Sequence, residues 1–157
     1  MQNITSLLLN SDHNVLTKKE LIEMPPLALA FVGDAVYELY IRSSICIDER
    51  RRDVNYLHRC AVTYVKAQAQ ATVVKILFDE LSEEEKNIVK RGRNAHPRTV
   101  PKNASISDYR YATGFEALLG YLYYSGNNDR LMDILEKSYK MINNKSGNGD
   151  SADETIV

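Results

Sequence analysis

Residues 27–47 read LALAFVGDAVYELYIRSSICI, and this stretch decides the fold. It has no internal proline and is apolar almost all round, which is typical of a central, buried helix rather than of an amphipathic surface helix. Pro25 and Pro26 stand directly before it, where proline suits the first turn of a helix. Residues 108–124 read DYRYATGFEALLGYLYY and have the same character. The sequence therefore predicts two buried helices.

Helical signals also cover most of the remaining chain. Capping-box patterns occur at residues 17–20 (TKKE) and 82–85 (SEEE). Apolar residues recur at helical spacing through residues 53–81, and residues 129–142 have the pattern of an amphipathic helix. Residues 91–107 read RGRNAHPRTVPKNASIS, with two prolines and no apolar period, which predicts a loop. No alternating strand pattern of useful length occurs, so the predicted fold class is all-α.

Length and composition predict one domain of an ordinary globular kind. The chain has 157 residues, of which 44% are hydrophobic, enough for a sizeable core. We expect a folded domain over residues 17–143, a flexible segment over residues 1–16 and a disordered tail over residues 144–157. Two cysteines give neither a disulfide framework nor a metal-binding spacing. No apolar run suits a signal peptide or a membrane span, so we expect a cytoplasmic protein without membrane contact.

The charges are balanced overall but not locally. Twenty basic and 21 acidic residues give a formal charge of −1, so nucleic-acid binding would need a local patch. One candidate patch has five basic and no acidic side chains, with polar donors interleaved: Lys90, Arg91, Arg93, Arg98 and Lys102, with Asn94, His96, Thr99 and Asn103. This block fits contacts to a phosphate backbone. It also fits a solvated helix end, because cations favour the negative end of the helix dipole.

Carboxylates occur in both predicted buried helices, where an unpaired charge is costly. Asp34 and Glu38 are four residues apart and share a face, and Glu116 stands alone in the second helix. In one interpretation, each pairs with a basic side chain. In the other, the two helices cross and bring Asp34 and Glu116 together around a cation. Oxygen ligands without His or Cys favour Mg²⁺ or Mn²⁺, and such a site suggests phosphoryl-transfer chemistry.

Several motifs resemble those of a known family. Residues 30–36 (AFVGDAV) resemble the signature helix of the ribonuclease III family, and residues 115–120 (FEALLG) resemble its second acidic motif. The chain is most similar to the Mini-III branch, whose members resemble a ribonuclease III catalytic domain without a double-stranded-RNA-binding domain. The motifs that resemble this branch are LALA at 27–30, KRGRNA at 90–95, PKN at 101–103 and YRYAT at 109–113. The similarity runs in order from about residue 27 to residue 142.

The resemblance implies an all-helical endonuclease domain of the ribonuclease III type, which works as a homodimer. It implies Mg²⁺-dependent cleavage of double-stranded RNA, with Mn²⁺ as a substitute, that leaves 5′-phosphate and 3′-hydroxyl ends. For the Mini-III branch, it further implies maturation of the precursor of large-subunit (23S) ribosomal RNA, with the pre-ribosomal particle as a partner.

The resemblance also assigns roles to individual residues. Asp34 matches the signature aspartate and Glu116 the glutamate of the second motif, which are catalytic carboxylates and metal ligands in the family. Ala30 and Thr113 replace two further family acids, a loss that is typical of the Mini-III branch. Glu38 and Thr113 are candidates for supporting the two carboxylates. The candidates for contacts to the RNA backbone are Arg91, Arg93, Asn94, Lys102, Asn103 and Arg110.

Two other functions are compatible with parts of this pattern. A catalytically inactive domain of the same fold, acting as an RNA-binding or ribosome-associated structural protein, would also explain Ala30 and Thr113. An all-α nucleotide pyrophosphohydrolase also uses carboxylates and Mg²⁺ on helices, but it would need several further acids at helical spacing that this chain lacks. Metal-dependent RNA cleavage separates the first alternative from the nuclease.

Overall fold

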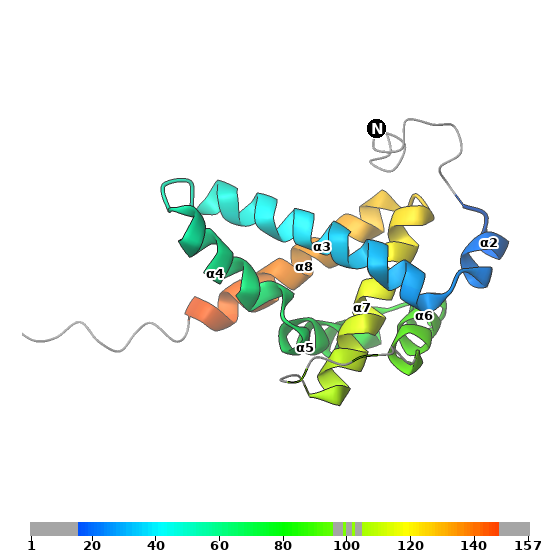
Figure 1. Ribbon diagram of the computed structural model, residues 1–157. Helices are drawn as coiled ribbons and strands as arrows, with labels where there is room; N and C mark the ends of the chain where they lie inside the picture. Colours follow the sequence, from blue (N-terminus) through cyan, green and yellow to red (C-terminus); the bar gives the residue numbers. More distant parts are fainter. Residues whose placement is uncertain (1–15, 96–98, 100–101, 103–104, 148–157) are drawn as a thin grey trace, which may run out of the picture.

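The computed structural model describes residues 16–95, 99, 102 and 105–147, and this part of the chain contains helices and no strand (Figure 1). The predicted all-α class is therefore confirmed. The elements are α2 (Lys18–Glu23), α3 (Pro26–Asp48), α4 (Val54–Val65), α5 (Ala67–Leu77), the 3₁₀ helix η1 (Phe78–Glu80), α6 (Glu83–Asn94), α7 (Ile106–Tyr124) and α8 (Asn128–Gly147).

Both capping boxes form as predicted. The Thr17 hydroxyl accepts a hydrogen bond from the backbone N–H of Glu20 at the start of α2, and the Glu20 carboxylate accepts one in return. Ser82 and Glu85 make the same reciprocal pair at the start of α6. These pairs satisfy backbone donors that a helix N-terminus otherwise leaves unpaired.

Apolar residues recur at a helical period throughout residues 53–81, but this segment forms separate helices rather than one continuous helix. Lys66 adopts an extended backbone (φ −62°, ψ 146°) and separates α4 from α5. The Gln70 side chain donates to the carbonyl of Val65 at 2.9 Å and so satisfies an acceptor at the end of α4. Because Lys66 is neither glycine nor proline, the local sequence gives no sign of this break. The last helix is also longer than predicted and continues to Gly147.

Helix α7 is the centre of the fold. Figure 1 shows it in yellow, crossed by α3, with α5 on one side and α6 on the other, and it packs against all three. Ten of its 19 residues are buried. Phe115 of α7 is fully buried and meets Tyr37 of α3 edge to face, with ring centroids 5.3 Å apart. Helix α7 is thus buried as predicted, whereas α3 buries only one face against it and leaves Phe31 and Leu39 exposed, so the prediction of a fully buried helix is wrong for α3.

Glycines allow this packing to be unusually close. A Cβ on Gly33 would lie 1.7 Å from the carbonyl oxygen of Glu116, and a Cβ on Gly120 would lie 2.0 Å from that of Leu29. The backbones of α3 and α7 are therefore in direct contact. The α6–α7 crossing works in the same way, since a Cβ on Gly114 would lie 2.6 Å from the carbonyl oxygen of Val89.

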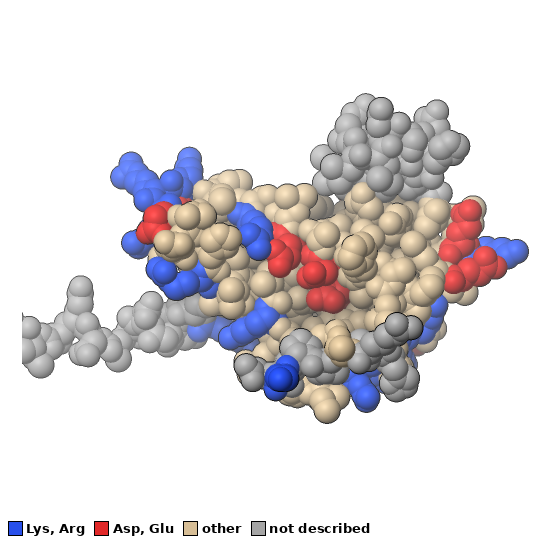
Figure 2. All heavy atoms as spheres, viewed as in Figure 1, with Lys and Arg blue, Asp and Glu red and all other residues tan. Residues whose placement is uncertain are grey.

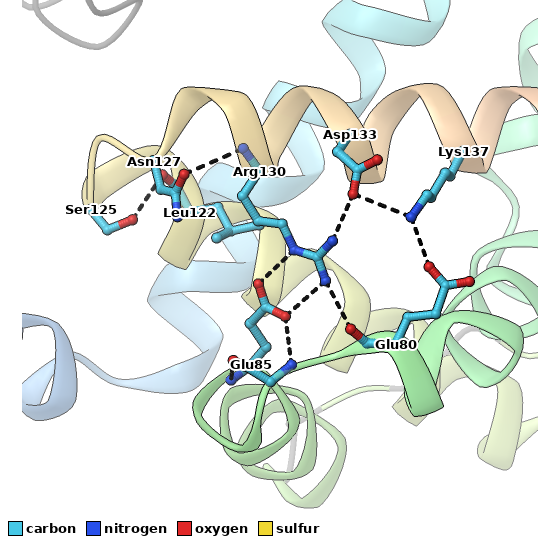
Figure 3. A network of polar contacts seen from close by, with 9 residues as sticks. Glu80, Glu85, Leu122, Ser125, Asn127, Arg130, Asp133 and Lys137 are labelled. Carbon is cyan, nitrogen blue, oxygen red and sulfur yellow. Dashed lines mark hydrogen bonds and ion pairs between the residues drawn. The ribbon is translucent and has the colours of Figure 1, made fainter.

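A polar network ties the start of α6 to α8 (Figure 3). The Arg130 guanidinium binds both carboxylate oxygens of Glu85, at 2.8 and 3.0 Å, and the carboxylate of Asp133 at 2.6 Å. Burial raises the pKa of Glu85, but the hydrogen bonds from Arg130 and from the Ser82 backbone outweigh it and hold this pKa below its ordinary value. Lys137 extends the network by bridging Asp133 and Glu80.

The close contact between α3 and α7 predicts that a side chain at position 33 destabilises the fold. Gly33→Ala places a methyl group where the Glu116 carbonyl stands, so the helices must move apart. We expect the free energy of unfolding to fall by about 3 kcal/mol or more. Urea denaturation followed by circular dichroism measures it. Ser43→Ala, at an exposed position of the same helix, is the control and should change this free energy by less than about 0.5 kcal/mol. Equal stability of the two variants would contradict the contact.

Candidate active site

The crossing of α3 and α7 brings the two predicted carboxylates to one place. Gly33, the residue before Asp34, contacts the backbone of Glu116 itself. The charge of Asp34 accordingly raises the pKa of Glu116. Figure 2 shows acidic side chains gathered in the middle of one face, over α3 and its crossing with α7, with Lys and Arg side chains on both sides. This is the arrangement expected if the two helices cross and bring Asp34 and Glu116 together around a cation.

The first interpretation, pairing with basic side chains, does not describe these two carboxylates. Within the described residues, neither Asp34 nor Glu116 takes part in an ion pair. Glu38 does, since its carboxylate lies 2.7 Å from the Arg42 guanidinium. Asp34 and Glu116 therefore keep their oxygen atoms available for a cation.

Burial changes the acidity of both groups. Desolvation raises the pKa of Glu116 to about 8, with the charge of Asp34 adding to the rise and a hydrogen bond from the Gln70 side chain opposing it. Partial desolvation of its carboxylate also raises the pKa of Asp34, and the charge of Glu38 contributes. At neutral pH, the proton on Glu116 relieves the repulsion between the two groups. A divalent cation would have to displace this proton.

The two positions that lack a family acid are part of the core. Ala30 is 5% exposed and Thr113 is 6% exposed. The Thr113 hydroxyl donates to the carbonyl of Tyr109 at 3.0 Å, one turn earlier in α7. Among the described residues, no group of three or more His, Cys, Asp or Glu side chains could hold a metal. Asp34 and Glu116 are thus a pair of acids rather than part of a larger acidic cluster.

Three of the predicted RNA contacts lie together. Arg93 and Asn94 at the end of α6 and Arg110 near the start of α7 line one pocket of about 430 Å³. Arg93 lies over the ring of Tyr111, with its guanidinium carbon 5.5 Å from the centroid, and Lys75 approaches the same ring at 4.5 Å. This arrangement concentrates positive charge around an aromatic ring, which suits a polyanion.

Of the other predicted contacts, Arg91 lies elsewhere. Arg91 donates to the carbonyl of Met24 at 3.0 Å and lines a different cavity, of about 830 Å³, beside Lys18. Lys102 is exposed. Asn103 lies outside the described residues, as do His96 and Arg98 of the basic block. The structure thus brings together three of the six predicted side chains.

Gln70 is a residue of this site that the sequence did not reveal. It lies in α5, is 1% exposed, and lowers the pKa of the nearby Glu116 carboxyl group. A polar residue at a core-facing position of α5 was the available signal, but glutamine is common on helix surfaces. Only the packing of α5 against α7 identifies it as buried.

Comparison with known proteins identifies the family. The Ribonuclease III domain family matches residues 27–127, which include both carboxylates. The chain belongs to the ribonuclease III family. A Mini-ribonuclease 3 of Thermoanaerobacter sp. (strain X514) is 56% identical over 128 residues, covering 82% of this chain and 89% of that protein. The Mini-ribonuclease 3 of Brevibacillus brevis is 46% identical over 133 residues, covering 82% and 98%.

A solved structure shares the fold. The crystal structure of a Fusobacterium nucleatum protein superimposes with a TM-score of 0.70 at 29% sequence identity, covering 76% of this chain and 94% of that one. The resemblance to the Mini-III branch is thereby confirmed, and the chain is an endoribonuclease of the ribonuclease III family. This family acts on double-stranded RNA and generally uses divalent metals. In the described part of the chain, no helix is both long and apolar enough to cross a membrane.

The raised pKa of Glu116 makes stability depend on pH. Between pH 4.5 and about 8, the folded chain keeps a proton that the unfolded chain loses, so the stability associated with this group falls as pH rises. Glu116→Gln cannot ionise. At about 1.4 kcal/mol per pH unit, we expect the variant to gain about 4 kcal/mol over the wild type between pH 5 and pH 8.5 in EDTA.

Thermal denaturation at both pH values measures this difference. Glu136→Gln, at an exposed position of α8, is the control and should follow the wild type. A constant difference between Glu116→Gln and the wild type would show that Glu116 is ionised throughout this range.

Proposed function

We propose that the chain is a Mg²⁺-dependent endoribonuclease that cleaves double-stranded RNA in the precursor of 23S ribosomal RNA. The observation that carries the proposal is the α3–α7 crossing, which joins two carboxylates without ion-pair partners. The resemblance to the Mini-III branch supports the ribosomal precursor as the substrate, and a pre-ribosomal particle as the setting.

The residues present fit a divalent cation. Two carboxylates without a His or Cys partner form a hard oxygen set, which suits Mg²⁺, with Mn²⁺ as a substitute. Gln70 adds a buried oxygen atom that has no hydrogen-bond partner in the described part of the chain. Asp34 and Glu116 would hold the cation. When bound, it supplies charge neutralisation at the scissile phosphate and lowers the pKa of the attacking water.

The chain's own residues carry out the rest of the reaction. Glu116 gives up its proton as the site is loaded, so both carboxylates then bear full charge. Arg93, Asn94 and Arg110 bind backbone phosphates and fix the duplex relative to the carboxylates. Water attacks phosphorus and the bond to the 3′ oxygen breaks, which leaves a 5′ phosphate and a 3′ hydroxyl. Because A-form RNA presents a shallow minor groove with 2′-hydroxyls, recognition is mostly of shape.

Cleavage of both strands requires two sites, and helix α3 offers the surface for a homodimer. Phe31 is 82% exposed, Leu39 is 57% exposed and Leu27 is 39% exposed. Spacings of four and eight residues place these side chains on one stripe of the helix. An aromatic ring this exposed indicates an interaction surface. A second copy is the occupant that we propose, because a two-fold pair would set two Asp34 side chains beside the shared interface.

Cleavage of a labelled RNA duplex and of precursor ribosomal RNA tests the nuclease. We expect Mg²⁺-loaded wild type to cut, and EDTA, Asp34→Asn or Glu116→Gln to reduce the rate at least about 100-fold, because each change removes charge stabilisation at the reacting phosphate. Asp79→Asn, at an exposed position of η1, is the control and should cut like the wild type.

The same experiment tests the alternative. Ala30 and Thr113 stand where the larger family has acids, and a domain that binds RNA without cutting it is the alternative that these two residues raised. If folded wild type binds the duplex in Mg²⁺ but cuts neither substrate, the nuclease proposal is wrong and the inactive RNA-binding module is the better description.

The dimer is tested by charging its proposed interface. Phe31→Asp buries a carboxylate in any interface that uses this stripe, so we expect dimerisation to weaken about 100-fold or more. Light scattering measures the mass, and a duplex assay distinguishes double-strand cleavage from nicking. Val62→Asp, at an exposed position of α4, is the control. A dimer that Phe31→Asp leaves intact would place the interface elsewhere.

A further inference from the structure

Gln70 is a buried polar side chain in a helix that contributes no acid to the site. It lies in α5, is 1% exposed, and belongs to the face of α5 that packs against α7. Asp34 comes from α3 and Glu116 from α7. The three side chains come from three helices, and the influence of Gln70 on the pKa of Glu116 places it near that carboxyl group.

The orientation of the carboxamide follows from its one backbone contact. Nε2 donates to the carbonyl oxygen of Val65 at 2.9 Å. Because a carbonyl can only accept a hydrogen bond, this contact identifies which end of the amide is nitrogen. The other end, Oε1, is buried and has no hydrogen-bond partner among the described residues.

An unsatisfied buried oxygen is costly, and an apolar side chain of the same shape would avoid that cost. Capping α4 through Val65 needs only the amide nitrogen and does not account for Oε1. The amide also lies close to the carboxyl group of Glu116, whose pKa it lowers. The carboxamide therefore stands beside a candidate metal ligand, and its own oxygen is left to accept a hydrogen bond.

We propose that Gln70 is a positioning residue of the metal site: its amide orients the Glu116 carboxylate, and Oε1 accepts a hydrogen bond from a water molecule bound to the divalent cation. This inference rests on the proposed function. Oε1 of Gln70 is then a third oxygen atom at the site, and it is neutral, unlike the carboxylate oxygens of Asp34 and Glu116. Groups that hold a metal ligand or a metal-bound water in place contribute strongly to affinity for the ion.

Gln70→Met tests this role, because methionine keeps the length and shape of glutamine without its polar atoms. The probe is Mn²⁺ alone, titrated into the full-length chain without RNA and followed by the electron paramagnetic resonance of the free ion. We expect Mn²⁺ affinity to fall about 10-fold or more. RNA affinity in EDTA should not change. Gln68→Met, at an exposed position of the same helix, is the control and should bind Mn²⁺ like the wild type.

Melting temperature separates positioning from a structural role. Gln70→Met removes one unsatisfied oxygen and unpairs the Val65 carbonyl, so we expect little net change in Tm. Mn²⁺ affinity that falls while Tm is kept supports the proposal. Unchanged Mn²⁺ affinity overturns it, and so does a large fall in Tm, which would make Gln70 a cap of α4. Wild type that binds no Mn²⁺ would instead overturn the metal site of the proposed function.

Discussion

The backbone contact between α3 and α7 is the constraint on which the rest of the structure depends. At Gly33 and Gly120, the two helices meet main chain to main chain, without side chains between them. Helices separated by ordinary side chains have axes 8–10 Å apart. The glycines remove that spacing, and for this reason the short side chain of Asp34 and the carboxyl group of Glu116 interact although they belong to different helices.

Helix α7 has to satisfy two such crossings at once. Gly114 faces the backbone of α6, while Gly120 faces that of α3. The end of α6 that carries Arg93 and Asn94 is therefore fixed relative to the same helix that carries Glu116. The Arg130 network holds the other end of α6 against α8. The carboxylates and the candidate phosphate-binding side chains thus share one rigid support, which suits the proposed reaction at a defined distance along a duplex.

The sequence predicts the helices and the two carboxylates well, because both depend on local pattern. Long stretches that are apolar almost all round are recognised as helices that contribute to the core, and carboxylates such as Asp34 and Glu116 are conspicuous within them. It does not predict the break at Lys66, because the apolar period continues across it and the side chain that satisfies the break comes from Gln70, four residues later. The sequence also does not predict that Arg91 and Arg93 have different surroundings. Their partners, the Met24 carbonyl and the Tyr111 ring, come from distant parts of the chain.

The proton on Glu116 has a consequence for how the protein exists without its metal. In structural zinc sites, several charged ligands repel one another when the ion leaves, and the chain unfolds. Here the pKa of Glu116 is raised to about 8, so a proton neutralises this carboxyl group at neutral pH and the two acids repel each other little without a cation. On the proposed function, a cation that enters this site would displace the proton of Glu116 into the solvent, on a scaffold that is already formed.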